Sequence, residues 1–196
     1  MTGRRILPFL IGTLVVAIAA ATLAMAGGTR AQVDDPNDVG GALDVRRVWF
    51  DPLAGPPRWT VLTFAAWDVE QIRDRGFVFV FLDTAGAERD DYYALLRADG
   101  SRLTGALWRD SVRGADVRIR SLGVMREDGS SLAVGVPVGP LLGPFRTSYA
   151  WWVVTTFTGQ VCRATCVDRV PDSGVFDEPV GSPTATATPS PSLSTR

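Results

Sequence analysis

Short strand-like segments recur along this chain, most of them with apolar residues at a period of two, and this pattern limits its fold more than any other feature. The segments cover residues 43–50, 59–67, 77–82, 92–98, 101–108, 117–124, 132–136 and 151–157. Such alternation puts every second side chain on one face of a β-strand. Turn-forming residues separate the segments, so the sequence predicts an all-β fold: an antiparallel β-sandwich of about eight strands, jelly-roll or immunoglobulin-like.

Asp-Gly dipeptides mark two of the turns, at residues 99–100 and 128–129. Asp-Gly favours tight hairpin turns, so the segments on either side of each dipeptide are predicted to pair as antiparallel hairpins.

One segment, residues 77–82, is apolar on both faces and carries three Phe on one of them. This composition predicts a central strand that is covered on both sides. Elsewhere, residues 69–75 are expected to form a short helical turn, and residues 137–144 a loop or a single helical turn.

The two ends of the 196-residue chain differ from its middle. Arg4 and Arg5 precede an uncharged stretch, so residues 1–26 are predicted to be a signal peptide or an N-terminal anchor, and the protein to be extracellular or at the cell surface. If uncleaved, this segment is the expected membrane contact. Residues 180–196 form a Thr/Ser/Pro-rich tail that is predicted to be disordered, which leaves residues 33–179 as one sandwich domain.

The chain contains neither His nor Lys, and this absence excludes several reaction classes. Histidine-dependent nucleophiles and zinc sites are not possible, nor are Schiff-base chemistry or a phosphate-binding lysine. The net charge of −1 gives no electrostatic reason to expect a nucleic-acid partner. We therefore expect a protein that is not an enzyme, with no catalytic residues to assign.

Carboxylates are the remaining route to acid–base catalysis. Asp90 and Asp91, or Asp83 nearby, are candidates for the acid pair of a glycoside hydrolase, which is the alternative function. However, adjacent residues on a strand point to opposite faces. Solvated turns, or ion pairs with arginines such as Arg97 and Arg109, are the expected roles.

Residues 82–86 read Leu-Asp-Thr-Ala-Gly, which resembles the γ-phosphate segment of small GTPases. That chemistry needs a lysine in a phosphate-binding loop, which this chain lacks. We expect instead a strand that ends at Asp83 and turns through Ala85 and Gly86.

Cys162 and Cys166 are the two cysteines of the chain. In an exported protein a disulfide is the default for such a pair, here closing a small loop after the strand 151–157. Two thiolates without His leave a tetrahedral zinc site half empty, and the spacing differs from that of thioredoxin-like motifs.

Oxygen ligands are dense just before the first expected strand, at Asp34, Asp35, Asn37, Asp38 and Asp44. Hard oxygen donors at this density suit Ca²⁺, so calcium is the cofactor to expect, with four residues as candidate ligands: Asp35, Asn37, Asp38 and Asp44. The spacing is not that of an EF-hand, so a site needs help from elsewhere, such as Asp168. The alternative is a solvated acidic leader between the signal segment and the domain.

Six Trp are spread over most of the expected strands. Trp151 and Trp152 are adjacent and must face opposite sides of their strand, so at least one is expected in the core. Core or surface packing is the simplest role for any single Trp, whereas stacking on sugar rings needs a cluster that one sequence does not reveal.

Several segments together resemble family 9 carbohydrate-binding-module-like, or DOMON-like, β-sandwiches, closest to the glucodextranase C-terminal type. The matching pieces are residues 35–45, Phe81-Leu82-Asp83 with Asp91-Tyr92-Tyr93, Val136-Pro137, and the Cys-x-x-x-Cys to Pro-Asp-x-Gly stretch 162–174.

This resemblance implies a non-catalytic sandwich, often stabilised by calcium, that binds carbohydrate or haem. Haem would lack a histidine ligand here and would depend on Met125. The expected function is therefore a secreted or surface-attached module for carbohydrate, with extracellular or cell-wall polysaccharide as partner. A carboxylate-based hydrolase and a purely structural or adhesive surface protein are the alternatives, and the ligand-binding residues stay unassigned.

Overall fold

The computed structural model describes residues 31–86, 91–159, 161–162 and 164–180. The predicted signal or anchor segment 1–26 lies outside the described residues, as does the predicted tail apart from Val180. Within the described ranges, no helix is both long and apolar enough to span a membrane.

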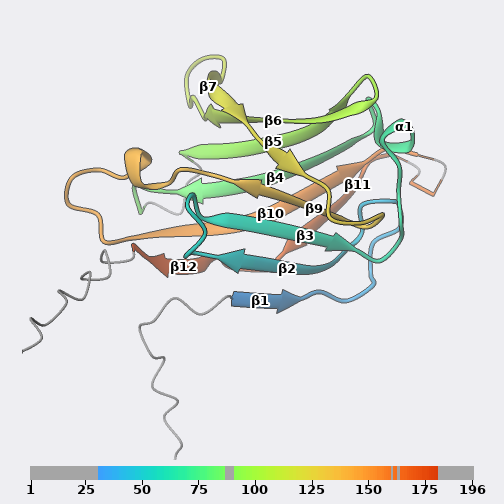
Figure 1. Ribbon diagram of the computed structural model, residues 1–196, viewed down its shortest axis with the longest axis horizontal. Helices are drawn as coiled ribbons and strands as arrows, with labels where there is room; N and C mark the ends of the chain where they lie inside the picture. The colour runs from blue at the N-terminus through green and yellow to red at the C-terminus, as the bar shows by residue number, and fades with distance from the viewer. Residues whose placement is uncertain (1–30, 87–90, 160, 163, 181–196) are drawn as a thin grey trace, which may run out of the picture.

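Two antiparallel sheets pack face to face, which confirms the predicted β-sandwich (Figure 1). Sheet A has the order β1-β2-β3-β9-β8, formed by Ala31–Asp34, Val45–Asp51, Arg58–Thr63, Ser131–Gly135 and Val124–Met125. Sheet B has the order β11-β10-β4-β5-β6-β7, formed by Cys166–Val170, Ser148–Phe157, Gly76–Asp83, Tyr92–Asp99, Arg102–Arg109 and Val117–Leu122. A short strand β12, Phe176–Pro179, also pairs with β10.

The core lies between the sheets and is built from the inward-facing residues of the alternating strands. Phe50 of β2 and Trp59 of β3 are fully buried, with ring centroids 4.7 Å apart. Trp151 of β10 contacts both rings from the opposite sheet. These three aromatic side chains fill the middle of the sandwich and remove large apolar surfaces from water.

The first predicted hairpin is confirmed. Strands β5 and β6 pair in the antiparallel register from Asp99 opposite Arg102 to Tyr92 opposite Arg109. Gly100 lies in the turn with a φ of 58°, a conformation that favours glycine.

The second predicted hairpin is mostly wrong, because residues 117–124 do not form one strand. Strand β7 pairs with β6 in sheet B, and the chain then crosses at Gly123 to sheet A, where β8 pairs with β9. Only the two residues of β8 make the predicted pairing. The alternation of the segment continues across the break, so it did not reveal that the chain changes sheets.

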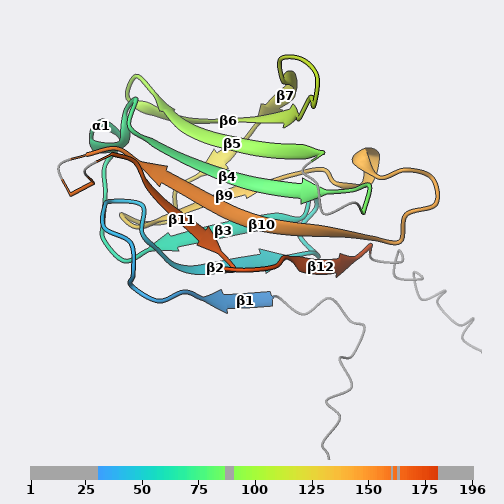
Figure 2. The ribbon, with the colours of Figure 1, turned by 180° about the vertical axis from the view of Figure 1, so that it is seen from behind.

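Strand β4 is central in sheet B, but the prediction that it is covered on both sides is wrong. Val78, Val80 and Leu82 face the core and are 0–2% exposed. The alternate residues Phe77, Phe79 and Phe81 are half-buried and lie on the outer face. Figure 2 shows sheet B from this side, and none of the described elements lies over it.

The two short helical turns are confirmed. Helix α1 covers Val69–Ile72, with the Asp68 side chain accepting a hydrogen bond from the Gln71 amide at its start. A single 3-10 turn, η1, covers Gly139–Leu141 before the chain enters β10. Strands β1, β11 and β12 were not predicted.

Candidate functional site

Four carboxylates from both ends of the domain gather where the two sheets meet, and we call them the acidic cluster: Asp35, Asp38, Asp44 and Asp168. Asp35 follows β1, Asp44 precedes β2, and Asp168 lies in the middle of β11. Carboxylate oxygens of Asp35, Asp38 and Asp168 all lie within 4.8 Å of one another. The structure thus brings the acidic stretch before β2 together with Asp168, as the sequence suggested.

Backbone contacts fix this juxtaposition. The Val45 amide donates a 2.6 Å hydrogen bond to Oδ2 of Asp168. Beside it, the Thr155 hydroxyl on β10 donates a 2.6 Å bond to the Leu43 carbonyl. Residues 35–44 are therefore held against sheet B.

Three of the four carboxylates of the acidic cluster are buried, and Asp38 is exposed. Asp35, Asp44 and Asp168 are 8%, 5% and 3% exposed. Across the described ranges, none of the four carboxylates forms an ion pair with an arginine. Oδ2 of Asp35 and Oδ1 of Asp44 are buried and have no hydrogen-bond partner among the residues that the structure describes. Such buried, unpaired acceptors are costly unless a proton or a cation satisfies them.

Burial is also the main reason that these acids resist ionisation. Loss of solvent, and then the nearby charge of Asp168, raises the pKa of Asp35 to about 7. Loss of solvent and the same charge raise the pKa of Asp44 to about 6, although an amide hydrogen bond from Val39 opposes the shift. Burial raises the pKa of Asp168 as well, against the stabilising Val45 amide. A divalent cation would relieve all three.

The residue types fit a hard divalent ion. Ca²⁺ takes oxygen ligands with flexible geometry, and the cluster offers carboxylates from two separate parts of the chain, residues 35–44 and Asp168. Asp35, Asp38 and Asp168 are the residues that would hold it, with Asp44 adding negative charge.

One member of the acidic stretch lies apart from this group. Asp34 is in β1 and forms an ion pair with Arg47, and that guanidinium lowers the pKa of its carboxyl group. Asn37, a predicted ligand, is exposed, as is Asp38. The sequence analysis missed Asp172, whose negative charge contributes to the raised pKa of Asp35.

The sulfur atoms of Cys162, in the loop after β10, and Cys166, the first residue of β11, lie at disulfide distance, and the bond closes the small loop that was predicted. This loop packs on the segment that carries the acidic cluster. Sγ of Cys162 is 3.7 Å from the Gly40 carbonyl oxygen. At Gly41, which has a φ of 118°, a Cβ would clash with the Phe157 ring. The disulfide thus borders the same end of the domain as the acids.

The outer face of sheet B carries a second candidate site, a row of rings that we call the aromatic face. It consists of Phe77, Phe79, Phe81, Tyr93, Trp108 and Trp152. Phe81 and Trp152 have ring centroids 5.4 Å apart and planes within 17°, and Tyr93 and Trp108 lie 6.4 Å apart within 6°. Phe81 also contacts Tyr93, so the row is continuous across β10, β4, β5 and β6.

Polar groups border the aromatic face. Arg169 of β11 lies over the Trp152 ring, 5.7 Å from its centroid. The Tyr93 hydroxyl donates a 2.6 Å hydrogen bond to Asp116. Arg118 is the register partner of Trp108 and therefore projects from the same side of the sheet. The alternation of side chains along each strand could have grouped these residues on one face, but it could not show which face of the sheet is the outer one.

The tryptophans divide between the core and the surface of the sheets, and Trp151 and Trp152 face opposite sides of β10, as predicted from their adjacent positions. Trp59 and Trp151 are core residues, and Trp67 is buried beneath Arg126, whose guanidinium lies 4.3 Å from its ring centroid. Trp49 lies on sheet A with its indole N–H bonded to Gln32. Trp108 and Trp152 belong to the aromatic face.

The carboxylates considered for a hydrolase have structural contacts. Strand β4 ends at Asp83, whose Oδ1 accepts hydrogen bonds from the Ala85 and Gly86 amides, so the predicted turn is confirmed. Oδ2 of Asp91 accepts from both the amide and the hydroxyl of Thr84. Asp90 lies outside the described residues. Within the described residues, Arg97 and Arg109 form no ion pair, and Asp83 and Asp91 take the turn role, which was the other expectation.

Comparison with known proteins adds no family. No protein-family model matches this chain, and neither a curated protein nor a solved structure matches it. Function must therefore be argued from the geometry alone.

Proposed function

We propose that this protein is an extracellular or cell-surface, non-catalytic module that binds carbohydrate on the aromatic face, with calcium bound in the acidic cluster as a structural ion. The observation that carries the proposal is the continuous row of rings on the outer face of sheet B, which none of the described elements covers.

The chemistry of this surface supports a sugar ligand. Five of the six rings are half-buried and Trp152 is 8% exposed, but no described element covers them. Soluble proteins rarely leave a continuous apolar row on an open sheet face without a binding role. The negative faces of aromatic rings attract the weakly positive C–H groups of a pyranose ring. Arginine and hydroxyl groups around the row, such as Arg169 and Tyr93, supply donors and acceptors for sugar hydroxyls.

Calcium in the acidic cluster supports this role indirectly. Asp168 stands on β11, which pairs with β10, and β10 carries Trp152. An ion shared by Asp35, Asp38 and Asp168 would tie sheet A to this edge of sheet B. A rigid sheet keeps the rings in place, and rigid elements support more specific sites than loops.

A structural or adhesive role is favoured by one specific observation. Strand β7 is an edge strand of sheet B, and its apolar residues Val117 and Ile119 are 43% and 44% exposed. An exposed apolar edge is a template for pairing with another chain. Concentration-dependent self-association that Ile119→Arg abolishes, without any glycan binding, would favour this alternative.

The proposal is tested with the mature domain on an array of cell-wall and extracellular polysaccharides, in millimolar calcium. We expect binding to a defined glycan class, with an affinity that falls about 10- to 100-fold in Trp108→Ala. Trp49→Ala is the matched control, because Trp49 lies on the other sheet, and it should bind like the wild type. Hydrolysis products from any bound glycan would favour the hydrolase, and equal loss in both variants would refute the aromatic face.

A further inference from the structure

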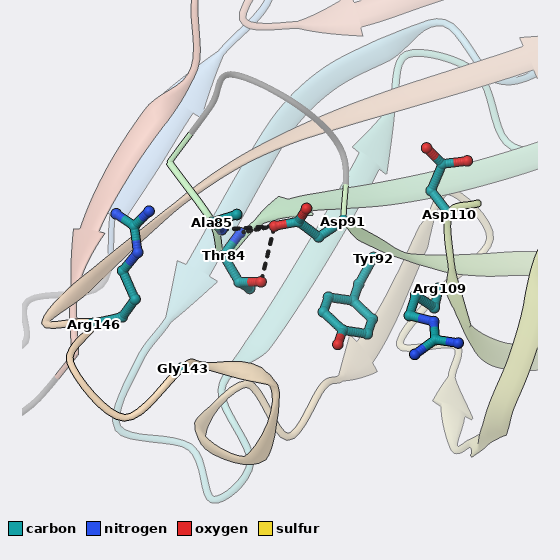
Figure 3. Close-up of a pocket in the computed structure, with 8 residues that line it drawn as sticks. All are labelled: Thr84, Ala85, Asp91, Tyr92, Arg109, Asp110, Gly143 and Arg146. Carbon is teal, nitrogen blue, oxygen red and sulfur yellow. Dashed lines mark hydrogen bonds between the residues drawn. The ribbon is translucent and has the colours of Figure 1, made fainter. Parts of the chain in front are cut away.

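A cavity of about 500 Å³ opens at one end of the sandwich (Figure 3). Its walls come from the turn after β4, the paired ends of β5 and β6, and the segment between η1 and β10. This volume is within the range of pockets that hold small ligands. Its lining includes Thr84, Asp91, Tyr92, Arg109, Asp110 and Arg146.

The register of sheet B brings Tyr92 and Arg109 into this cavity. They are direct partners across β5 and β6, so their side chains project from the same side of the sheet. Tyr92 packs against the core cluster, which identifies this side as the inner one. Arg109 therefore extends the inner face beyond the last core residues, at the open end of the sandwich.

Arg146 reaches the cavity from the loop before β10. Its guanidinium lies close against Gly86, where a Cβ would clash with it, and Gly86 has a φ of 74°. Only glycine suits both the backbone conformation and this close approach. In Figure 3, Arg109 and Arg146 lie on opposite sides of the cavity, with Tyr92 and Thr84 between them.

Among the described residues, the two acids that line the cavity, Asp91 and Asp110, are not paired directly with these arginines. Oδ2 of Asp91 accepts the Thr84 amide at 2.9 Å, the Thr84 hydroxyl at 3.0 Å and the Ala85 amide at 2.6 Å. The Asp110 carboxylate points away from the Arg109 guanidinium (Figure 3). Throughout the described ranges, neither Arg109 nor Arg146 forms an ion pair or a side-chain hydrogen bond.

We infer that this cavity binds a sugar carboxylate, that is, a uronic acid unit of an acidic polysaccharide. Each guanidinium group offers paired N–H donors that match the geometry of one carboxylate, so the two arginines, on opposite sides of the cavity, would contact different carboxylates of the same acidic chain. The Thr84 and Tyr92 side chains lie between them, where they face the rest of a sugar ring. That the carboxylate belongs to a sugar rests on the proposed function; the cavity itself is a separate site from the aromatic face.

The test compares two trisaccharides that differ only in charge. β-1,4-linked triglucuronate carries three carboxylates, and cellotriose is its carboxyl-reduced counterpart. Titration calorimetry on the folded domain should give an affinity for triglucuronate at least about tenfold higher, and the difference should shrink as salt rises.

Variants locate the binding. Arg109→Gln and Arg146→Gln should each weaken triglucuronate binding about 10- to 100-fold, since each loses a charge-assisted contact. Arg102→Gln is the matched control, because Arg102 is exposed at the other end of the same strand, β6. If a Gln variant unfolds, Arg109→Lys and Arg146→Lys keep the charge and should lose affinity with normal folding.

The outcomes separate this inference from the proposed function. Equal affinity for the two trisaccharides, or triglucuronate binding that is unchanged in both Gln variants, would overturn the cavity site. Binding to neither trisaccharide would overturn it too. The proposed function is judged independently, by Trp108→Ala on the polysaccharide array, and either result can fail without the other.

Discussion

The amide of Val45 donates a 2.6 Å hydrogen bond to Oδ2 of Asp168, joining the first residue of β2 in sheet A to the middle of β11 in sheet B. The two residues are 123 positions apart in the sequence. Asp35 and Asp44 lie around this contact with one unsatisfied oxygen each. The link between the sheets therefore carries a concentration of buried negative charge.

Substitution of Asp168 by Asn tests whether calcium compensates this charge. The amide oxygen of Asn can still accept the Val45 hydrogen bond, while the repulsion toward Asp35 disappears. In excess EDTA we expect Asp168→Asn to melt at a higher temperature than the wild type. In millimolar calcium only the wild type should gain stability, by about 2.7 kcal/mol at a concentration 100 times Kd.

Asp177→Asn is the control for this experiment, because Asp177 is an exposed carboxylate on β12. It should respond to calcium as the wild type does. Identical wild-type melting curves in calcium and in EDTA, with no calcium bound by calorimetry, would contradict the metal centre.

The stability of the calcium-free protein should fall as pH rises from about 4 to 8. The pKa of Asp35 is about 7 and that of Asp44 about 6 in the folded state, against an ordinary value of 3.8. The folded state therefore holds more protons than the unfolded chain in this window, so proton binding stabilises it. That stability is fully present below pH 4 and is lost as the pH rises through the folded pKa values.

Urea denaturation in EDTA at pH 5 and pH 8 measures this effect. The free energy of unfolding should be lower at pH 8, and Asp35→Asn should reduce the difference. Millimolar calcium should restore stability at pH 8, since the ion replaces the protons. Higher stability at pH 8 than at pH 5 in EDTA would show that these acids are not buried together.

The sandwich could be predicted from local sequence because the alternation of residues within most strands shows that one face of the strand is buried. The sequence did not reveal which face of β4 is inside. Its Phe side chains are larger than its Val side chains, yet the valines face the core because Trp59 and Trp151 already fill the space between the sheets. Side-chain volume is a property of the whole core, which a single segment does not contain.

Long-range contacts set a similar limit on predicting the candidate sites. The density of acids at residues 34–44 predicted a metal site, and Asp168 was suggested only as a partner from the other end of the domain. The cavity arginines could not be predicted from the sequence. Arg109 and Arg146 lie on elements that only the tertiary fold brings together. No local spacing relates them.

Loss of the Cys162–Cys166 disulfide should have a small effect on stability. The cysteines are separated by four positions, and cross-linking so short a loop removes little entropy from the unfolded chain. The loop-entropy relation gives about 2 kcal/mol. The Cys162→Ser/Cys166→Ser double variant should therefore remain folded, and denaturation should show a loss near this value.

This loop also packs against Gly40 and Gly41, beside the acidic cluster. The double variant should consequently bind calcium more weakly, while glycan binding on the aromatic face is unchanged. A loss of more than about 4 kcal/mol would mean that the loop has a larger role in folding than its length implies.

Two tryptophans of sheet B, Trp151 on the inner face and Trp108 on the outer face, should separate effects on stability from effects on binding. Trp151 is 1% exposed and contacts Phe50, Trp59 and Phe176, so Trp151→Ala leaves a large cavity and should cost about 3–5 kcal/mol. Trp108 is half-buried on the outer face, and its removal should cost less than half as much. Denaturant titration of both variants measures the difference. Glycan affinity should fall more in Trp108→Ala than in Trp151→Ala. The folded fraction of Trp151→Ala keeps the aromatic face, whereas Trp108→Ala loses part of it. A loss of affinity that only follows the loss of stability would refute a binding role for these rings.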